Sequence, residues 1–220
     1  RNLTREYGVL LVFDEVITGF RVSPGGAQGY YDVDPDLTTL AKIMAGGLPG
    51  GAVAGKTEIV DLISIEKHPK SKKMPHPGTF NANPLSAAAG IQMLKIAKTG
   101  QPQTEANQVA GIFRHGINQI FDQHGLDWAC YGEFSGFKIL LGHGDKTLPA
   151  VDFDAYQCHY RRLKGASNPD LVKTLRCGLL LNGIDMTSGG GMTTAVHTET
   201  DIQQTISAFD QTIQEMKLED

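Results

Sequence analysis

The sequence has little cysteine and no long apolar run. Its three cysteines, Cys130, Cys158 and Cys177, are too few and too scattered among 220 residues for a disulfide framework or a zinc site. No apolar stretch approaches the roughly 18 residues that a membrane span requires, and no secretory signal opens the chain. We therefore expect reduced thiols, no metal site, no membrane partner and a cytoplasmic location.

The sequence also lacks an excess of positive charge. Its formal net charge is -4 at pH 7, so it has none of the basic footprint that is typical of nucleic-acid-binding proteins. The one markedly basic stretch, residues 67–77, is polar and broken by prolines. Charge patterning favours a solvated loop there over an anion-binding or nucleic-acid patch, and we expect no nucleic-acid partner.

Apolar patterning predicts short strands in the first part of the chain. Residues 8–13 form a continuous run rich in valine and leucine, which is typical of a strand buried on both faces of a parallel sheet. Further strands are predicted at 37–42 and 51–55. Residues 19–36 are rich in glycine, proline, tyrosine and aspartate, which favours a long loop.

Helical patterns follow these strands. Asn83-Pro84 predicts the start of a helix, and residues 103–123 carry an apolar face with the helical period. Around Gly125 the elements become shorter, so we expect an α/β domain over 1–124 and a smaller α+β domain over 125–220. The second domain is predicted to contain strands at 128–131, 137–141 and 192–196, helices at 152–164 and 169–182, and a closing helix behind a capping box of Thr198 and Asp201.

Two residues near strand ends are candidates for chemistry. Asp14 lies at the carboxyl end of the first predicted strand, where open parallel sheets bind ligands; it could pair with a cationic ring nitrogen, or equally cap a helix or form a salt bridge. Lys42 is flanked by Leu40, Ile43 and Met44, and partial desolvation would make its amine a better nucleophile toward an aldehyde. A lysine taken alone is more often one that snorkels to solvent. Pyridoxal phosphate chemistry needs both a carboxylate and an amine of these kinds.

A third candidate is the pair Gly78-Thr79, shortly before the helix that begins at Asn83-Pro84. Backbone N–H groups and a hydroxyl in this position can bind an oxyanion. Most such sequences are ordinary helix caps, so the pair by itself leaves both interpretations open.

The order and the amino-acid sequences of these segments resemble those of the class III pyridoxal-phosphate aminotransferases. The resemblance is carried by residues 13–21, by 35–42 with the following Gly-Gly-Leu-Pro, and by 78–84. Residues 22–28 and 196–202 are most similar to the branch that contains glutamate-1-semialdehyde 2,1-aminomutase. The likeness runs nearly end to end and is most specific between Asp14 and Lys42.

The resemblance implies a fold and a set of roles. The fold would be fold type I, with part of a large α/β domain that has a mainly parallel sheet, followed by a small C-terminal α+β domain. Lys42 would form the Schiff base with pyridoxal 5'-phosphate and move the proton, Asp14 would pair with the pyridine nitrogen, and Val16 would pack on the ring. Gly78 and Thr79 would bind the cofactor phosphate of a neighbouring subunit, across a homodimer interface.

The sequence departs from this family in two respects. It starts at Arg1 without a methionine and has no counterpart of the family's N-terminal half, which carries a phosphate loop and a stacking aromatic residue. We therefore interpret it as the C-terminal portion of a longer enzyme, inactive by itself. In addition, residues 187–192 read Thr-Ser-Gly-Gly-Gly-Met, where the aminomutases carry an acidic, aromatic-flanked segment.

Three functions remain open from the sequence. The leading one is transamination between an amino donor and a keto acid or aldehyde acceptor, both small molecules. The second is an intramolecular glutamate-1-semialdehyde 2,1-aminomutase, which needs no second substrate. The third is an inactive fragment or non-catalytic homologue, against which the intact Asp14 and Lys42 argue.

Overall fold

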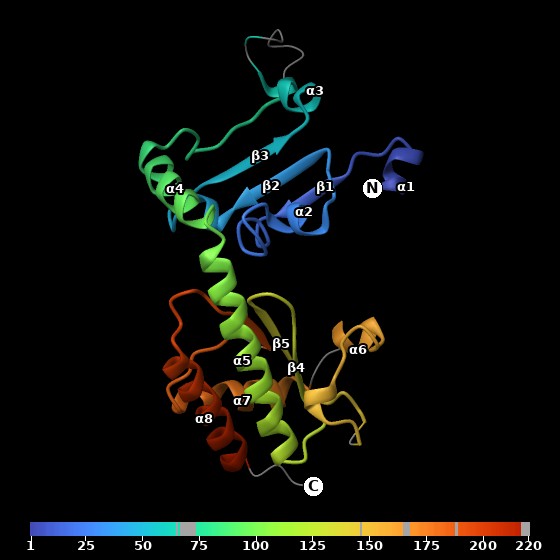
Figure 1. Cartoon of the computed structure of the whole chain (residues 1–220), viewed down its shortest axis with the longest axis vertical. Helices are drawn as coiled ribbons and strands as arrows, with labels where there is room; N and C mark the ends of the chain where they lie inside the picture. The colour runs from blue at the N-terminus through green and yellow to red at the C-terminus, as the bar shows by residue number, and fades with distance from the viewer. Residues whose placement is uncertain (65, 67–73, 146, 165–167, 188, 217–220) are drawn as a thin grey trace. The chain divides into compact units, whose positions relative to one another are not determined.

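A computed structural model of the chain describes residues 1–64, 66, 74–145, 147–164, 168–187 and 189–216 (Figure 1). Most of the basic stretch predicted at 67–77 lies outside the described residues. The chain forms two compact units, Arg1–Gln103 and Thr104–Asp220. None of the described helices combines the length and the apolar character needed to cross a bilayer.

The first unit contains a three-stranded sheet with the order β1-β2-β3. Its strands are β1 (Val12–Glu15), β2 (Leu37–Ala41) and β3 (Gly51–Gly55). β1 and β2 run parallel, whereas β2 and β3 run antiparallel, so this part of the sheet is mixed. Because β1 and β2 run in the same direction, their carboxyl ends lie at the same edge.

The prediction of a strand at 8–13 that is buried on both faces is wrong. Pairing begins at Val12, and the side chains of Val9, Leu10 and Val12 are 56%, 56% and 49% exposed. Within the described chain, β1 is an edge strand that pairs with β2 alone, so one of its edges has no strand to cover it.

Five short helical segments and one long helix accompany this sheet. They are α1 (Asn2–Glu6), α2 (Gly26–Tyr31), η1 (Lys42–Ala45), α3 (Thr57–Val60), η2 (Asp61–Ile63) and α4 (Pro84–Ala97). α2 forms inside the segment predicted to be a loop because the buried carboxylate of Glu15 accepts hydrogen bonds from the N–H groups of Ala27 and Gln28, at 2.8 and 2.7 Å. These two donors lie in the first turn of α2, where N–H groups have no partner within the helix.

Asp36 directly precedes β2, at the end of the sheet opposite to the carboxyl ends of β1 and β2. Its carboxylate contacts the side chains of Arg1 and Lys56, each at 2.6 Å, and accepts the N–H of Leu11 at 2.8 Å. The hydrogen bond from Arg1, followed by those from Leu11 and Lys56, holds the pKa of Asp36 well below its usual range. Asp36 thus connects Leu11, just before β1, and Lys56, just after β3, to the start of β2.

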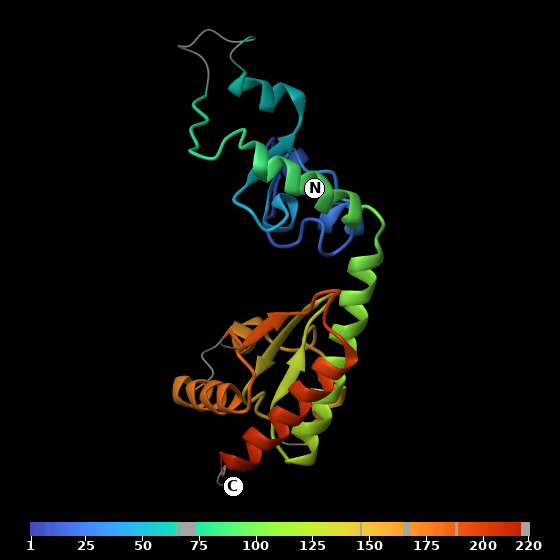
Figure 2. The same cartoon turned by 90° about the vertical axis from the view of Figure 1, so that its left-hand side faces the viewer.

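The second unit is an antiparallel sheet with helices packed on it. Its strands, in the order β4-β5-β6, are β4 (Ala129–Tyr131), β5 (Gly136–Leu140) and β6 (Gly190–Met192). The helical segments are α5 (Gln101–Gln123), η3 (Ala150–Asp152), α6 (Tyr160–Lys164), α7 (Pro169–Leu181) and α8 (Glu199–Glu215). Figure 2 shows α5 and α8 side by side on one face of this sheet. Between them, the ring of Phe209 packs edge to face on Phe113 and Phe121, with centroids 6.3 and 6.4 Å apart.

The two units divide at Gln103, near the start of α5, whereas the sequence predicts a boundary at residue 124. The apolar face of α5, including Phe113, Ile117 and Phe121, belongs to the core of the second unit, which is why the helix goes with that unit. The helix predicted at 152–164 forms only over its last turn, as α6. Asp154 accepts the N–H of Tyr156 at 2.9 Å, and such a local side-chain bond competes with helix formation.

The start of α8 and the position of β6 can both be compared with the sequence predictions. The capping box is confirmed, because Asp201 Oδ2 accepts the N–H of Thr198 and Thr198 Oγ1 accepts the N–H of Asp201. The last strand lies at Gly190–Met192 rather than at 192–196. Gly190 is required by packing, since a Cβ there would lie 2.7 Å from the backbone carbonyl oxygen of Phe137.

Candidate functional site

Asp14 and Lys42 lie at the same edge of the first sheet. Asp14 pairs with Thr39 across the parallel strands β1 and β2, and Lys42 directly follows Ala41, the last residue of β2. Side chains that are 28 positions apart in the sequence are therefore brought to the carboxyl ends of neighbouring parallel strands, where open α/β sheets bind ligands.

One oxygen of Asp14 is engaged and the other is free. Oδ1 accepts the N–H of Val16 at 3.1 Å and the hydroxyl of Thr39 at 3.0 Å. Within the described part of the chain, Oδ2 has no hydrogen-bond partner and Asp14 forms neither a helix cap nor an ion pair. The neighbouring carboxylate, Glu15, is the one that caps a helix. Asp14 therefore presents one free carboxylate oxygen at the sheet edge.

Lys42 occupies an unusual backbone conformation. Its φ is 51°, in the left-handed region that non-glycine residues seldom adopt, and η1 begins at this residue. Its side chain is exposed, so the expected partial desolvation by its apolar neighbours is not found within the described chain. No ion pair engages its amine among the described residues. Strained backbone of this kind is often found at functional sites.

Helix α4 holds the turn that carries Lys42. A Cβ at Gly90 would lie 2.6 Å from the carbonyl oxygen of Met44, and one at Gly46 would lie 2.7 Å from that of Ala89. Each glycine therefore permits a backbone approach that a side chain would block. This close packing fixes the position of η1 and hence of Lys42 at its start.

Gly78 and Thr79 lie on an exposed turn before α4. The carbonyl of Gly78 accepts the N–H of Asn81 at 3.2 Å. The side chain of Asn83, not Thr79, caps α4 by accepting the N–H groups of Leu85 and Ser86. In the described chain, no hydrogen bond or ion pair links Gly78 or Thr79 to the pair Asp14 and Lys42. Asp14, Val16 and Lys42 thus lie at the carboxyl ends of β1 and β2, whereas Gly78 and Thr79 lie on the turn before α4, whose residues Phe80 and Asn81 line a pocket together with Met44 and Ala45 of η1.

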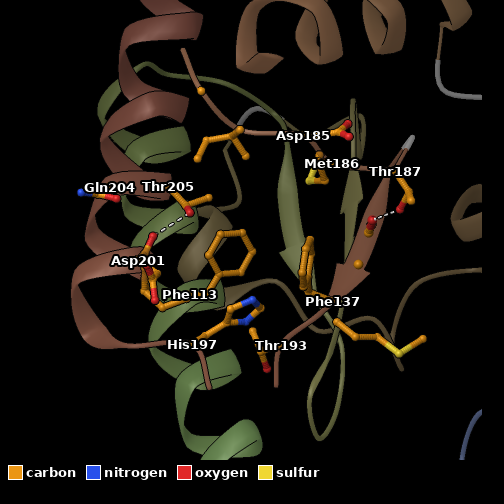
Figure 3. A pocket seen from close by; sticks show the side chains of 16 residues that line it. Phe113, Phe137, Asp185, Met186, Thr187, Thr193, His197, Asp201, Gln204 and Thr205 are labelled. Atoms are coloured by element: carbon orange, nitrogen blue, oxygen red, sulfur yellow. Dashed lines mark hydrogen bonds between the residues drawn. The ribbon is translucent and has the colours of Figure 1, made fainter. Parts of the chain in front are cut away.

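Thr187 and Gly190–Met192 border a pocket of about 550 Å³ in the second unit (Figure 3). Phe113 and Phe137 line it together with His197 and Asp201. Its threonines are already engaged: Thr187 donates to Gly190, Thr193 to Ala106, and Thr205 to Asp201. These three hydroxyls already donate inside the chain, whereas the side chains of Asp185 and Gln204 also line the pocket.

The sequence interpretation missed Thr39 and Glu15. Thr39 contacts Asp14 only because of the register between β1 and β2, which no local pattern reveals. Glu15 directly follows Asp14, and an acidic pair at a strand end could have suggested two separate roles.

The described residues contain no group of three or more histidine, cysteine, aspartate and glutamate side chains placed to hold a metal ion.

Comparisons with known proteins agree on the family. A family model described as Aminotransferase class-III matches residues 1–127. A glutamate-1-semialdehyde 2,1-aminomutase from Methanosarcina acetivorans is 36% identical over 215 residues, which are 95% of this chain and 46% of that protein. An omega-transaminase structure from Sphaerobacter thermophilus is 28% identical with a TM-score of 0.83, and the match covers 99% of this chain and 47% of that one.

A glutamate-1-semialdehyde aminomutase structure from Pseudomonas aeruginosa is 20% identical to this chain, with a TM-score of 0.77. The match covers 98% of this chain and 47% of that one, and it shows that the fold is shared. That fold is fold type I of the pyridoxal-phosphate-dependent transferases. The chain spans about half the length of the curated relatives it matches. Because the family model covers more than half of its residues, the chain belongs to the class III aminotransferases, a family of pyridoxal-phosphate-dependent enzymes.

Proposed function

We propose that Asp14 and Lys42 form the cofactor end of an aminotransferase site. The protein would carry out transamination between an amino donor and a keto acid or aldehyde acceptor. The observation that carries this proposal is the placement, at the carboxyl ends of two adjacent parallel strands, of a carboxylate oxygen and a primary amine that have no partner among the described residues. Family membership supports it.

These residues fit pyridoxal phosphate, which supplies, when bound, a reactive aldehyde and an electron-withdrawing ring. Oδ2 of Asp14 would accept a hydrogen bond from the protonated ring nitrogen, and a charge-assisted bond of this kind is among the stronger ones in proteins. Val16 would contact the ring. The amine of Lys42 would bond to the aldehyde carbon of the cofactor. Once released from that carbon, Nζ would accept and donate the proton that the reaction moves.

We also propose that the working unit is a homodimer. Gly78 and Thr79 would bind the cofactor phosphate of the neighbouring subunit. Two observations support this: the turn that carries them is exposed, and no hydrogen bond joins it to Asp14 or Lys42 of its own chain within the described residues.

A second candidate is an intramolecular aminomutase, because relatives with that name are 32–41% identical to this chain. Residues 187–192 favour transamination, since they contain no acidic side chain, although packing against β5 accounts for part of the glycine run. The two functions differ in their need for a second substrate. Turnover of glutamate 1-semialdehyde without any acceptor would favour the mutase, and turnover only with a donor and an acceptor would favour the transaminase.

The experiment that tests the cofactor site is borohydride reduction of the full-length gene product loaded with pyridoxal phosphate, followed by peptide mapping. We expect the phosphopyridoxyl label on Lys42. Lys56 is the internal control, because its amine is engaged with Asp36 at 2.6 Å. A label on Lys56 or on another lysine would contradict the assignment, and a lack of any label would favour a non-catalytic homologue.

A further inference from the structure

We propose that Thr39 is a positioning residue for Asp14, and that its hydroxyl sets which carboxylate oxygen faces the cofactor ring. This inference rests on the proposed function. Thr39 is half-buried in the middle of β2, directly opposite Asp14 in the parallel pairing. Its Oγ1 donates a hydrogen bond of 3.0 Å to Oδ1 of Asp14.

Two donors converge on the same oxygen of Asp14. The hydroxyl of Thr39 comes from the neighbouring strand, and the N–H of Val16, at 3.1 Å, comes from the turn that follows β1. Hydrogen bonds are directional, so two donors on Oδ1 restrict rotation of the carboxylate and leave Oδ2 free. With the N–H of Val16 alone, the carboxylate could turn and lose that orientation.

The adjacent residue Thr38 provides a matched control. Successive strand residues point to opposite faces of a sheet, and Thr38 is buried, where it donates to Oε1 of Gln28 at 3.3 Å. Its hydroxyl supports packing of α2 and does not contact Asp14. Removing each hydroxyl in turn therefore separates a role in orienting Asp14 from a general role in stabilising β2.

The test uses the full-length gene product loaded with pyridoxal phosphate labelled with ¹⁵N at the ring nitrogen. Thr39→Val keeps the shape of the side chain but removes the donor. We expect cofactor binding to weaken by up to roughly tenfold, because the unrestrained carboxylate must then be ordered when the cofactor binds, and a ring-nitrogen ¹⁵N shift that moves toward the unprotonated form at a lower pH than in wild type. Thr39→Ser should restore both values to near wild type.

Thr38→Val should lower the melting temperature but leave the ¹⁵N titration unchanged. The inference is overturned if Thr39→Val keeps the wild-type titration and affinity, or if Thr38→Val alters them as much. Failure of the proposed function looks different, since the wild-type protein would then give no borohydride label on Lys42 and the role of Thr39 would fall with it. A wild-type label on Lys42 combined with an insensitive Thr39→Val rejects the role of Thr39 alone.

Discussion

Gly90 of α4 approaches Met44 of η1 so closely that a Cβ at position 90 would lie 2.6 Å from the carbonyl oxygen of Met44. The helix that follows the Gly78-Thr79 turn thereby fixes the turn that carries Lys42. A backbone carbonyl cannot move aside as the end of a flexible side chain can, so α4 or η1 would have to shift if a methyl group were added.

Gly90→Ala is therefore expected to destabilise the protein by about 1–3 kcal/mol, the usual cost of overpacking. Helix propensity alone would give the opposite sign, a gain of up to about 1 kcal/mol. Gly111→Ala in α5 is the matched control, because a Cβ at position 111 would have no heavy atom within 4 Å, and it should be neutral or stabilising. Urea unfolding of the three proteins measures both effects, and equal gains for both variants would show that the contact is unimportant.

The two neighbouring carboxylates should respond differently to neutralisation. Asp14→Asn should fold normally yet lose activity by several orders of magnitude, because an amide cannot hold a proton on the ring nitrogen. Glu15→Gln should destabilise the protein by about 1–3 kcal/mol, because its amide cannot accept both N–H groups of α2 and leaves one unsatisfied. Thermal unfolding and turnover assays check both, with the exposed Glu58→Gln as control. A fully active Asp14→Asn would refute its role.

Asp36 should make stability depend on pH. Its pKa is depressed in the folded state, chiefly by the hydrogen bond from Arg1, so its contribution is fully present above the unfolded pKa of about 4 and is lost as the pH falls through the folded value. We expect the melting temperature to fall below about pH 5 in wild type and to change less in Asp36→Asn. Asp185→Asn, in the second unit, should keep the wild-type profile. Parallel profiles for wild type and Asp36→Asn would contradict this explanation.

The proposed shared site predicts complementation between two inactive variants. Thr79→Ala would remove a phosphate contact from the partner's site, and Lys42→Ala would remove the reactive amine. A mixed dimer of these chains has one site with both groups intact, so mixing them should restore part of the activity after subunit exchange. Each variant assayed alone is the control, and a lack of recovery with exchange verified would count against the shared site.

The 220-residue chain by itself is expected to bind pyridoxal phosphate weakly or not at all. Its relatives are about twice as long, and β1 leaves apolar side chains at Val9, Leu10 and Val12 about half exposed. We therefore expect the chain to self-associate, which size-exclusion chromatography would show as early elution. We also expect it to need a further segment to complete the sheet. A monodisperse, cofactor-loaded and active 220-residue protein would show that this expectation is mistaken.

Much of this protein was accessible from the sequence alone. Short-range signals were sufficient for β2, β3, α4, α5 and α8: Asn83-Pro84 marks the start of α4, and α5 and α8 each carry an apolar face with the helical period. The capping box of Thr198 and Asp201 was equally accessible, since both partners lie within four positions. The motif order around Asp14 and Lys42 was enough to indicate the family, which the comparisons show.

Other features were decided only by contacts between distant residues. The sequence could not distinguish whether Asp14 or Glu15 caps a helix, because the answer depends on where α2 packs. Thr39 meets Asp14 through strand register, and the close packing of α4 on η1 fixes the turn that carries Lys42. α5 joins the second unit because its aromatic face packs in that core. Register and packing are properties of the assembled chain, so only the tertiary structure could settle them.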